Sequence, residues 1–336
     1  MAAFARRRFL WATLALAGAG LLVGCTLLPV SSPAAPKVAR IGLLSPFGPA
    51  ETGRWEEALR KGLADLGWVE GRNLIIEYRY AQGRSDRLPE LADDLVRQSV
   101  DVIVTSTSTD AIPAKRATGT IPIVMASPAD PVASGLVESL AHPGGNVTGL
   151  SQIAPELAGK RLELLRAIRP RLSRIGVLWN PQGPSSMATW NEIQAPAREL
   201  GIQIDSLEAR SLDDLERVFQ GTLGAGDEAL VILPDPLFAV NMARTADLAA
   251  KAGLPSIFHL REFPDAGGLM SYGPDRTDMF RRAAAYVDKI LKGTRPADLP
   301  IQQPTKFEFV VNLRVAQALG LSMPQAVLQQ ATEVIQ

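Results

Sequence analysis

The chain has 336 residues, 46% of them hydrophobic, and its 35 basic side chains balance 35 acidic ones. That hydrophobic fraction suffices for a large core, and the length is typical of two domains. Because the net charge is zero and no basic cluster follows Arg8, the sequence lacks the electrostatic footprint of a nucleic-acid-binding protein.

The first 24 residues have the pattern of a signal peptide. Arg6, Arg7 and Arg8 precede an apolar run over residues 9–23, which at about 15 residues is shorter than the roughly 20 needed to span a bilayer. The run ends in Leu22-Val23-Gly24-Cys25, which resembles the lipobox of bacterial lipoproteins. The resemblance implies that Cys25 carries the lipid. The arginines also resemble a twin-arginine export signal, so the export route stays open.

The cysteine content fits a location outside the cytoplasm. Cys25 is the only cysteine, so the folded part has neither an internal disulfide nor a thiolate metal site. No second membrane segment follows, and residues 25–37 form the lipidated N-terminus and a tether rich in proline, serine and alanine. We expect a chain anchored by lipid to the cell envelope membrane, on its periplasmic or cell-surface side, with the membrane leaflet left open.

The remaining sequence contains an internal repeat. Residues 40–46 (RIGLLSP) recur as 174–181 (RIGVLWNP), and each copy reads as a buried strand that ends in a polar loop. Further strands are predicted in matching order at residues 74–77 and 202–205, 101–105 and 229–233, and 121–124 and 254–257. Helices with apolar faces separate the strands, among them one that carries Trp55, Leu59, Leu63 and Leu66.

This alternation predicts the α/β fold class, with two doubly wound parallel-sheet lobes. Continuous apolar strands indicate sheets covered by helices on both faces. Open α/β sheets bind ligands at the carboxyl ends of their strands, so we expect the ligand cleft between the two lobes. Two independent lobes on a linker are less compatible with the short junction near residues 148–155.

Residues 129–149 (ADPVASGLVESLAHPGGNVTG) resemble a bacterial family of ABC-transporter substrate-binding lipoproteins that includes tryptophan- and tyrosine-binding members. Similar agreement occurs at residues 67–74 (GWVEGRNL), 271–275 (SYGPD), 303–308 (QPTKFE) and 318–321 (ALGL). The resemblance implies a type I periplasmic-binding-protein fold that the chain crosses three times. Lobe one is then expected at residues 38–150 plus 271–299, and lobe two at 151–270 plus 300–336.

Ten residues are expected in loops that face the cleft: Ser45, Phe47, Ser106, Thr107, Ser127, Trp179, Asn180, Asp235, Phe238 and Tyr272. Ser106 and Thr107 precede a helix, where hydroxyls and free backbone N–H groups suit a ligand carboxylate. Asp235 suits an ammonium group on the other lobe. The alternatives stay open: N-capping of the helix by Thr109 or Asp110 for the first pair, a turn for Asp235, an Asx-turn for Asn180 and core or hinge packing for the aromatics.

Three functions are compatible with such a fold. The repeat and the family motifs favour the first, a solute-binding protein of an ABC importer. It is expected to be a monomer without a cofactor that captures a small solute, an amino acid or related carboxylate, for the importer's permease and ATPase. The second is a ligand sensor for a membrane signalling partner. The third, an α/β enzyme, lacks sequence support, because neither a G-x-S-x-G nor a phosphate-loop motif occurs and His142 and His259 stand far apart.

Overall fold

The computed structural model describes residues 38–152, 155–222 and 226–336. The predicted signal peptide, Cys25 and the tether lie outside these residues. Among the described residues, no helix combines the length and apolar character needed to cross a bilayer. The described residues all belong to one compact unit, Val38–Gln336.

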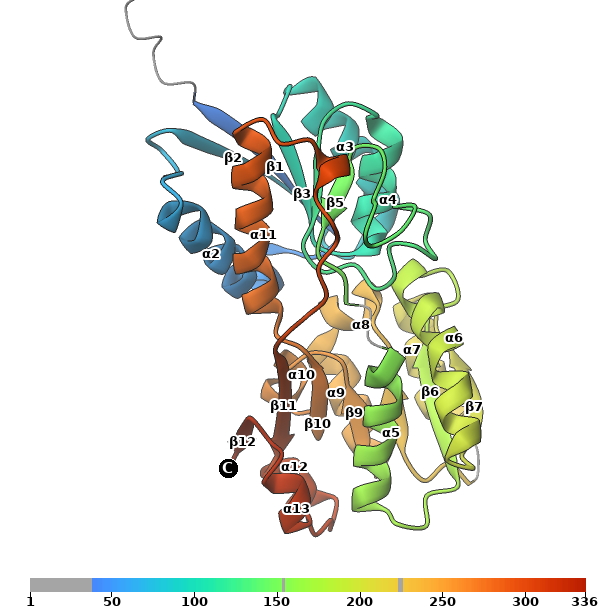
Figure 1. Cartoon of the computed structure of the whole chain (residues 1–336). Coiled ribbons are helices and arrows are strands. Elements are labelled where there is room, and N and C mark those ends of the chain that lie inside the picture. The colour runs from blue at the N-terminus through green and yellow to red at the C-terminus, as the bar shows by residue number, and fades with distance from the viewer. Residues whose placement is uncertain (1–37, 153–154, 223–225) are drawn as a thin grey trace, which may run out of the picture. The chain divides into compact units, whose positions relative to one another are not determined.

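The first sheet has five parallel strands in the order β2-β1-β3-β4-β5 (Figure 1). These are β1 (Ala39–Ser45), β2 (Leu74–Tyr80), β3 (Val102–Thr105), β4 (Ile123–Met125) and β5 (Val147–Gly149). Helices α2 (Pro49–Asp65) and α11 (Arg276–Leu291) pack together over one face, and α3 (Leu88–Arg97) and α4 (Ser108–Ala117) cover the other. The four strands predicted in the first copy of the repeat are confirmed.

The second sheet has seven strands in the order β12-β11-β10-β9-β8-β6-β7. The strands are β6 (Arg174–Trp179), β7 (Gln203–Glu208), β8 (Leu230–Ile232), β9 (Ser256–Phe258), β10 (Met270–Pro274), β11 (Phe307–Asn312) and β12 (Glu333–Ile335). The predicted strands of the second copy are β6 to β9, so the repeat is confirmed. Because β11 runs antiparallel to β10, this sheet is mixed, which the repeat did not predict.

Helices cover both faces of the second sheet as well. They are α5 (Pro155–Ile168), α6 (Pro184–Glu199), α7 (Leu212–Arg217), α8 (Pro236–Val240), α9 (Met242–Lys251), α10 (Glu262–Asp265), α12 (Leu313–Ala318) and α13 (Gln325–Leu328). Short helical turns occur at Ser85–Arg87, Val218–Thr222 and Pro296–Asp298. Apolar side chains of α5 and α6 pack on one face of the sheet, and those of α7, α8, α9 and α10 pack on the other.

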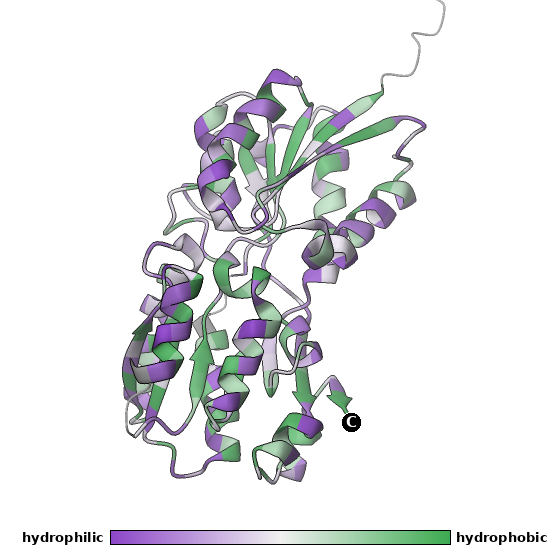
Figure 2. Ribbon diagram, turned by 180° about the vertical axis from the view of Figure 1, so that it is seen from behind, coloured by the Kyte–Doolittle hydropathy of each residue, from purple (hydrophilic) through white to green (hydrophobic). Residues whose placement is uncertain are grey.

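The hydropathy pattern explains which residues form the core. Figure 2 shows hydrophobic strands between helices whose outer faces are hydrophilic. Trp55, Leu59 and Leu63 are buried in α2, as their spacing predicts. Leu66 caps the C-terminus of this helix and is 40% exposed, so its predicted burial is wrong. Residues 131–135 form turns, in which the Asp130 carboxylate accepts hydrogen bonds from the backbone N–H of Val132 and Ala133.

The chain passes between the sheets at three places. Ser151 N donates to the Gln302 carbonyl at 2.9 Å, and Asp275 N donates to the Lys306 carbonyl at 3.0 Å, so the crossings are tied to one another. We propose to assign each segment to the lobe whose sheet or core it joins. Strand β10 pairs within the second sheet, and Ile301 packs with the core of the first, so both returns fall a few residues later than the expected positions 271 and 300.

Candidate functional site

Polar side chains of the first sheet gather where its parallel strands end. Asp110 in α4 is fully buried and accepts hydrogen bonds from Ser106 N at 2.5 Å and Thr107 N at 2.7 Å, and from both hydroxyls. The Ser106 hydroxyl also bonds to that of Ser45 at 3.3 Å. Thr107 is the N-cap of α4, and the Oγ1 atoms of Thr105 and Thr109 have no partner among the described residues. The N-cap is thus Thr107 and not Thr109 or Asp110, and Asp110 completes the capping box from the third position of the helix. These contacts do not test ligand binding.

Ser127 is tied to the first crossing. The side-chain amide of Gln152 donates to the Ser127 carbonyl at 2.8 Å and to its hydroxyl at 2.6 Å. Gln152 also lines a small cavity beside Arg161. Ser127 thus holds a cavity residue in place.

The predicted residues of the second sheet divide into packed and polar side chains. Trp179 stacks on Trp190 with ring centroids 4.5 Å apart and donates to Ser206, and Phe238 is fully buried in the core. The Tyr272 ring stacks against Phe307 in the partly buried rim of the core. The aromatic side chains of Trp179, Phe238 and Tyr272 thus make packing contacts within their own lobe, and the proposed site does not include them.

Asp235 and Asn180 hold the loops of two adjacent strands together. Asp235 Oδ1 caps α8 through Leu237 N at 2.9 Å and lies 3.3 Å from the Asn180 amide. Oδ2 of the same carboxylate is buried without a hydrogen-bond partner among the described residues, and burial raises the pKa of Asp235 to about 6. A Cβ atom on Gly183 would lie 1.9 Å from Oδ2, so the glycine makes room for this carboxylate.

Two buried arginines were missed by the sequence analysis. Arg276 begins α11 and is 4% exposed, and its guanidinium carbon lies 4.8 Å from the centre of the Trp55 ring and 5.9 Å from that of Phe47. Phe47 therefore packs against a cation through its ring. Nη1 of Arg276 is buried and has no hydrogen-bond partner among the described residues. Burial lowers the pKa of Arg276 to about 10, still far above neutrality.

Arg161 is the second buried arginine and comes from α5 on the other sheet. It is 3% exposed, and its Nε donates to the Tyr272 carbonyl at 2.8 Å. His259, at the end of β9, is buried near both arginines; burial and then the charges of Arg276 and Arg161 hold the pKa of His259 well below its usual value. The imidazole is thus neutral, and its Nδ1 is buried without a partner among the described residues.

A small cavity lies beside Arg161. It is lined by Ala129, Gln152, Leu157, Arg161, Thr189, Glu192 and Pro234, and its volume is about 20 Å³. Ala129 follows a strand of the first sheet, whereas most of the other residues belong to the second. Burial raises the pKa of Glu192 to about 7, Asp130 adds to this effect, and Arg161 opposes it. The cavity therefore combines a buried cation with a titratable carboxyl group.

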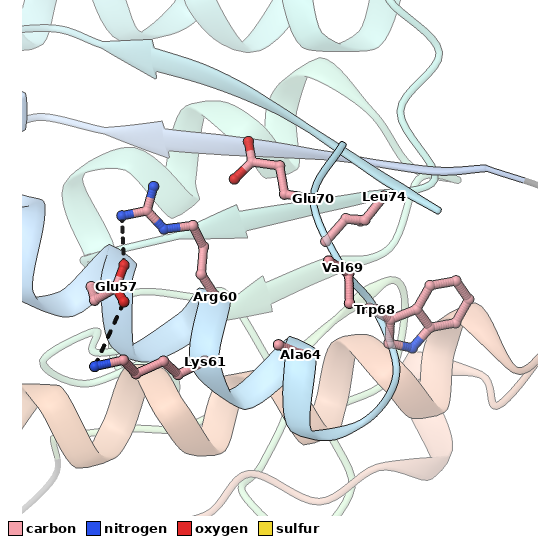
Figure 3. Close-up of a pocket in the computed structure, with 8 residues that line it drawn as sticks. All are labelled: Glu57, Arg60, Lys61, Ala64, Trp68, Val69, Glu70 and Leu74. Carbon is pink, nitrogen blue, oxygen red and sulfur yellow. Dashed lines mark hydrogen bonds and ion pairs between the residues drawn. The ribbon is translucent and has the colours of Figure 1, made fainter. Parts of the chain in front are cut away.

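A larger pocket of about 240 Å³ lies at the end of the first sheet where strand β2 begins (Figure 3). It is formed by α2 and the start of β2, where Glu57 pairs with Arg60 at 2.9 Å and with Lys61 at 3.6 Å. Three of its charged side chains thus pair with one another, and the pocket lies away from the carboxyl ends of the strands, where such sheets bind ligands. Elsewhere too, the described residues contain no cluster of three or more His, Cys, Asp or Glu side chains suited to a metal ion.

Two α/β lobes joined by three crossings, with unpartnered polar groups at the strand ends, define the chain as a type I periplasmic binding protein. Solved structures agree. The conserved domain protein from Vibrio cholerae O1 biovar eltor is 29% identical, covers 89% of this chain and 100% of its own, and superimposes with a TM-score of 0.84. The ABC domain in complex with L-Trp from Streptococcus pneumonia is 26% identical, with coverages of 88% and 99% and a TM-score of 0.83.

The chain belongs to the ABC transporter substrate binding protein family, whose model matches residues 52–335. It is also similar to a tyrosine-binding protein from Clostridioides difficile strain R20291. The two are 26% identical over 261 residues, which cover 78% of this chain and 75% of the relative. The family and fold expected from residues 129–149 are confirmed, and the family is one of binding proteins rather than enzymes.

Proposed function

We propose that this protein captures an amino acid or a closely related carboxylate outside the cytoplasm and delivers it to the permease of an ABC importer. The proposal includes a lipid on Cys25, which would hold the protein beside its transporter in the membrane. Binding is reversible and non-covalent, and the protein acts as a monomer without a cofactor. The relatives that bind tryptophan and tyrosine support the ligand class.

One observation carries the proposal: each sheet contributes a buried arginine, and neither arginine forms a salt bridge with an acidic side chain among the described residues. Arg276 lies against the first sheet and Arg161 against the second, and both are close enough to His259 to lower its pKa. Desolvating a guanidinium group is costly unless an anion compensates for it. A solute carboxylate supplies that anion.

The same arrangement explains how a solute would close the lobes. A carboxylate that contacts Arg276 and Arg161 together binds the closed form more tightly than the open form, in which only one arginine is within reach. Only such differential affinity shifts a conformational equilibrium. Closure then presents a distinct surface to the transporter, which separates loaded from empty protein.

Thermal unfolding in the presence of single solutes tests this function. We expect at least one of the twenty proteinogenic L-amino acids to raise the melting temperature, whereas myo-inositol and ribose leave it unchanged. A ligand at a hundredfold excess over its Kd contributes about 2.7 kcal/mol to the free energy of unfolding. If no amino acid or small carboxylate stabilises the protein, the proposed function is wrong.

A further inference from the structure

We propose that the turn Ala81–Arg84 in lobe one and helix α8 in lobe two form an apolar clasp that holds the lobes together, whether or not a solute is bound. The clasp is a conformational device apart from the solute site, because the contact is between Gly83 and Val240, which carry no polar side-chain atoms. Its effect on solute affinity rests on the proposed function, whereas its effect on the distance between the lobes does not.

The turn follows strand β2 and is held by the loop after β1. Gly83 N donates to the Pro46 carbonyl at 2.7 Å, and Arg84 N closes the turn by donating to the Ala81 carbonyl at 3.0 Å. Gln82 and Gly83 have positive φ values of +53° and +81°, as the two central residues of a type I′ turn do. Lobe one therefore presents the tip of this turn in one fixed position.

Val240 of lobe two lies against the backbone of Gly83. The position that a Cβ atom on Gly83 would occupy is 3.2 Å from Cγ1 of Val240 and 3.4 Å from its Cβ and Cγ2 atoms. At 3.2 Å such an atom would have to displace the valine by a few tenths of an ångström. The valine thus reaches the turn only because residue 83 has no side chain.

Helix α8 is fixed to lobe two, so Val240 cannot move far unless the lobe moves with it. The helix lies on the side of lobe two that faces lobe one (Figure 1). Phe238 in the same helix is fully buried, and Asp235 caps the helix by accepting a hydrogen bond from Leu237 N at 2.9 Å. The clasp therefore joins a fixed turn to a fixed helix, and a change at either side alters the distance between the lobes.

The clasp adjoins an apolar cluster that the two lobes share. The buried part of this cluster includes Phe47 and Trp55 of lobe one together with Phe238 and Phe258 of lobe two, and Val240 packs against it. Apolar contacts are non-directional and need no ligand to complete them, so they favour the closed form without solute as well. Because a solute binds the closed form more tightly, a larger closed fraction lowers the apparent Kd.

The distance between the lobes tests the clasp without any solute. Spin labels on Glu90→Cys in α3 and Ala243→Cys in α9, exposed positions of lobe one and lobe two, report the open and closed fractions by pulsed electron paramagnetic resonance. Labelled protein without the added cysteines accounts for any label at Cys25. Val240→Ala removes two methyl groups from the clasp, so we expect the ratio of closed to open molecules to fall about tenfold.

Gly83→Ala should have the same effect for the opposite reason, because its added methyl group pushes Val240 away. Combining the two substitutions makes room for that methyl group, so the double variant should recover most of the closed fraction. Gly71→Ala is the matched control, since Gly71 has a φ of +79° and an added Cβ atom there meets nothing within 4 Å. It introduces similar backbone strain without touching lobe two and should leave the ratio unchanged.

Calorimetric titration with L-tryptophan and L-tyrosine measures the consequence for binding. We expect Val240→Ala and Gly83→Ala each to raise the Kd about tenfold, with the double variant and Gly71→Ala close to the unmodified protein. Unchanged label distances in both Val240→Ala and Gly83→Ala would overturn the clasp. Failure of every proteinogenic amino acid to bind would overturn the proposed function, whereas the label distances would still decide the clasp.

Discussion

Replacing Arg276 by methionine should abolish solute binding and at the same time leave the ligand-free protein as stable as before, or more stable. Arg276 is 4% exposed, and its Nη1 has no hydrogen-bond partner among the described residues. Desolvating a charge without a salt-bridge partner costs several kcal/mol, and an apolar side chain of similar volume avoids this cost. The lost cation–π contact with Trp55 offsets part of this gain, by about 2 kcal/mol when desolvated.

The binding loss is expected to be large, because a charge-assisted contact to the solute carboxylate is removed and a polar solute group is left unpaired. We expect the Kd to rise at least a hundredfold, about 2.7 kcal/mol. Titration calorimetry measures the Kd, and urea unfolding of the same preparation measures the free energy of unfolding. Arg281→Met is the matched control, since this arginine lies in the same helix but is exposed and pairs with Asp65. Arg276→Met with unchanged affinity would remove Arg276 from the site.

Replacing Gly149 by alanine is expected to destabilise the fold strongly. Gly149 ends β5 with a φ of +130°, a conformation that L-amino acids rarely adopt. A Cβ atom there would lie 2.2 Å from the carbonyl oxygen and 2.7 Å from the nitrogen of Met125. Both are backbone atoms of the neighbouring strand β4, so the strain cannot be relieved by moving a side chain. We expect a loss of about 3 kcal/mol or more, combining overpacking with the strained backbone.

Gly119→Ala provides the comparison for this substitution. Its added Cβ atom meets nothing within 4 Å, and its φ lies outside the strained range. Alanine there should change the free energy of unfolding by less than about 1 kcal/mol. Urea unfolding of the unmodified protein and the two variants at one pH measures the change in the free energy of unfolding. A Gly149→Ala protein as stable as Gly119→Ala would show that β4 and β5 are not packed as described.

The repeat was enough to predict most of the fold. Strands β1 and β6 are continuous apolar runs because both faces of each sheet are buried. The helices between the strands have apolar stripes because one side of each helix faces a sheet. The antiparallel strand β11 was not predicted, since a strand's direction depends on the chain's return through Gln302 and Lys306 rather than on its own residues.

The candidate site was harder to predict, because its charged residues come from helices rather than from the strand-end loops. Arg161 stands between Leu157 and Leu165 at a spacing of four residues, in the middle of the apolar stripe of α5. Arg276 continues the buried stripe of Met279, Phe280 and Ala283 in α11. An arginine within an apolar stripe is a signal in the sequence, since charged side chains are seldom fully buried without a partner. Glu192 carries a weaker signal, because its exposure is intermediate.

Native mass spectrometry of the gently purified full-length protein most directly tests the central claim that the buried arginines bind a solute carboxylate. We predict a bound fraction with one small molecule per chain, which on release is identified as an amino acid or related carboxylate. The same fraction should be missing from Arg276→Met and present in Arg281→Met. A released solute without a carboxylate, or equal loading of the Arg276→Met protein, would contradict the account.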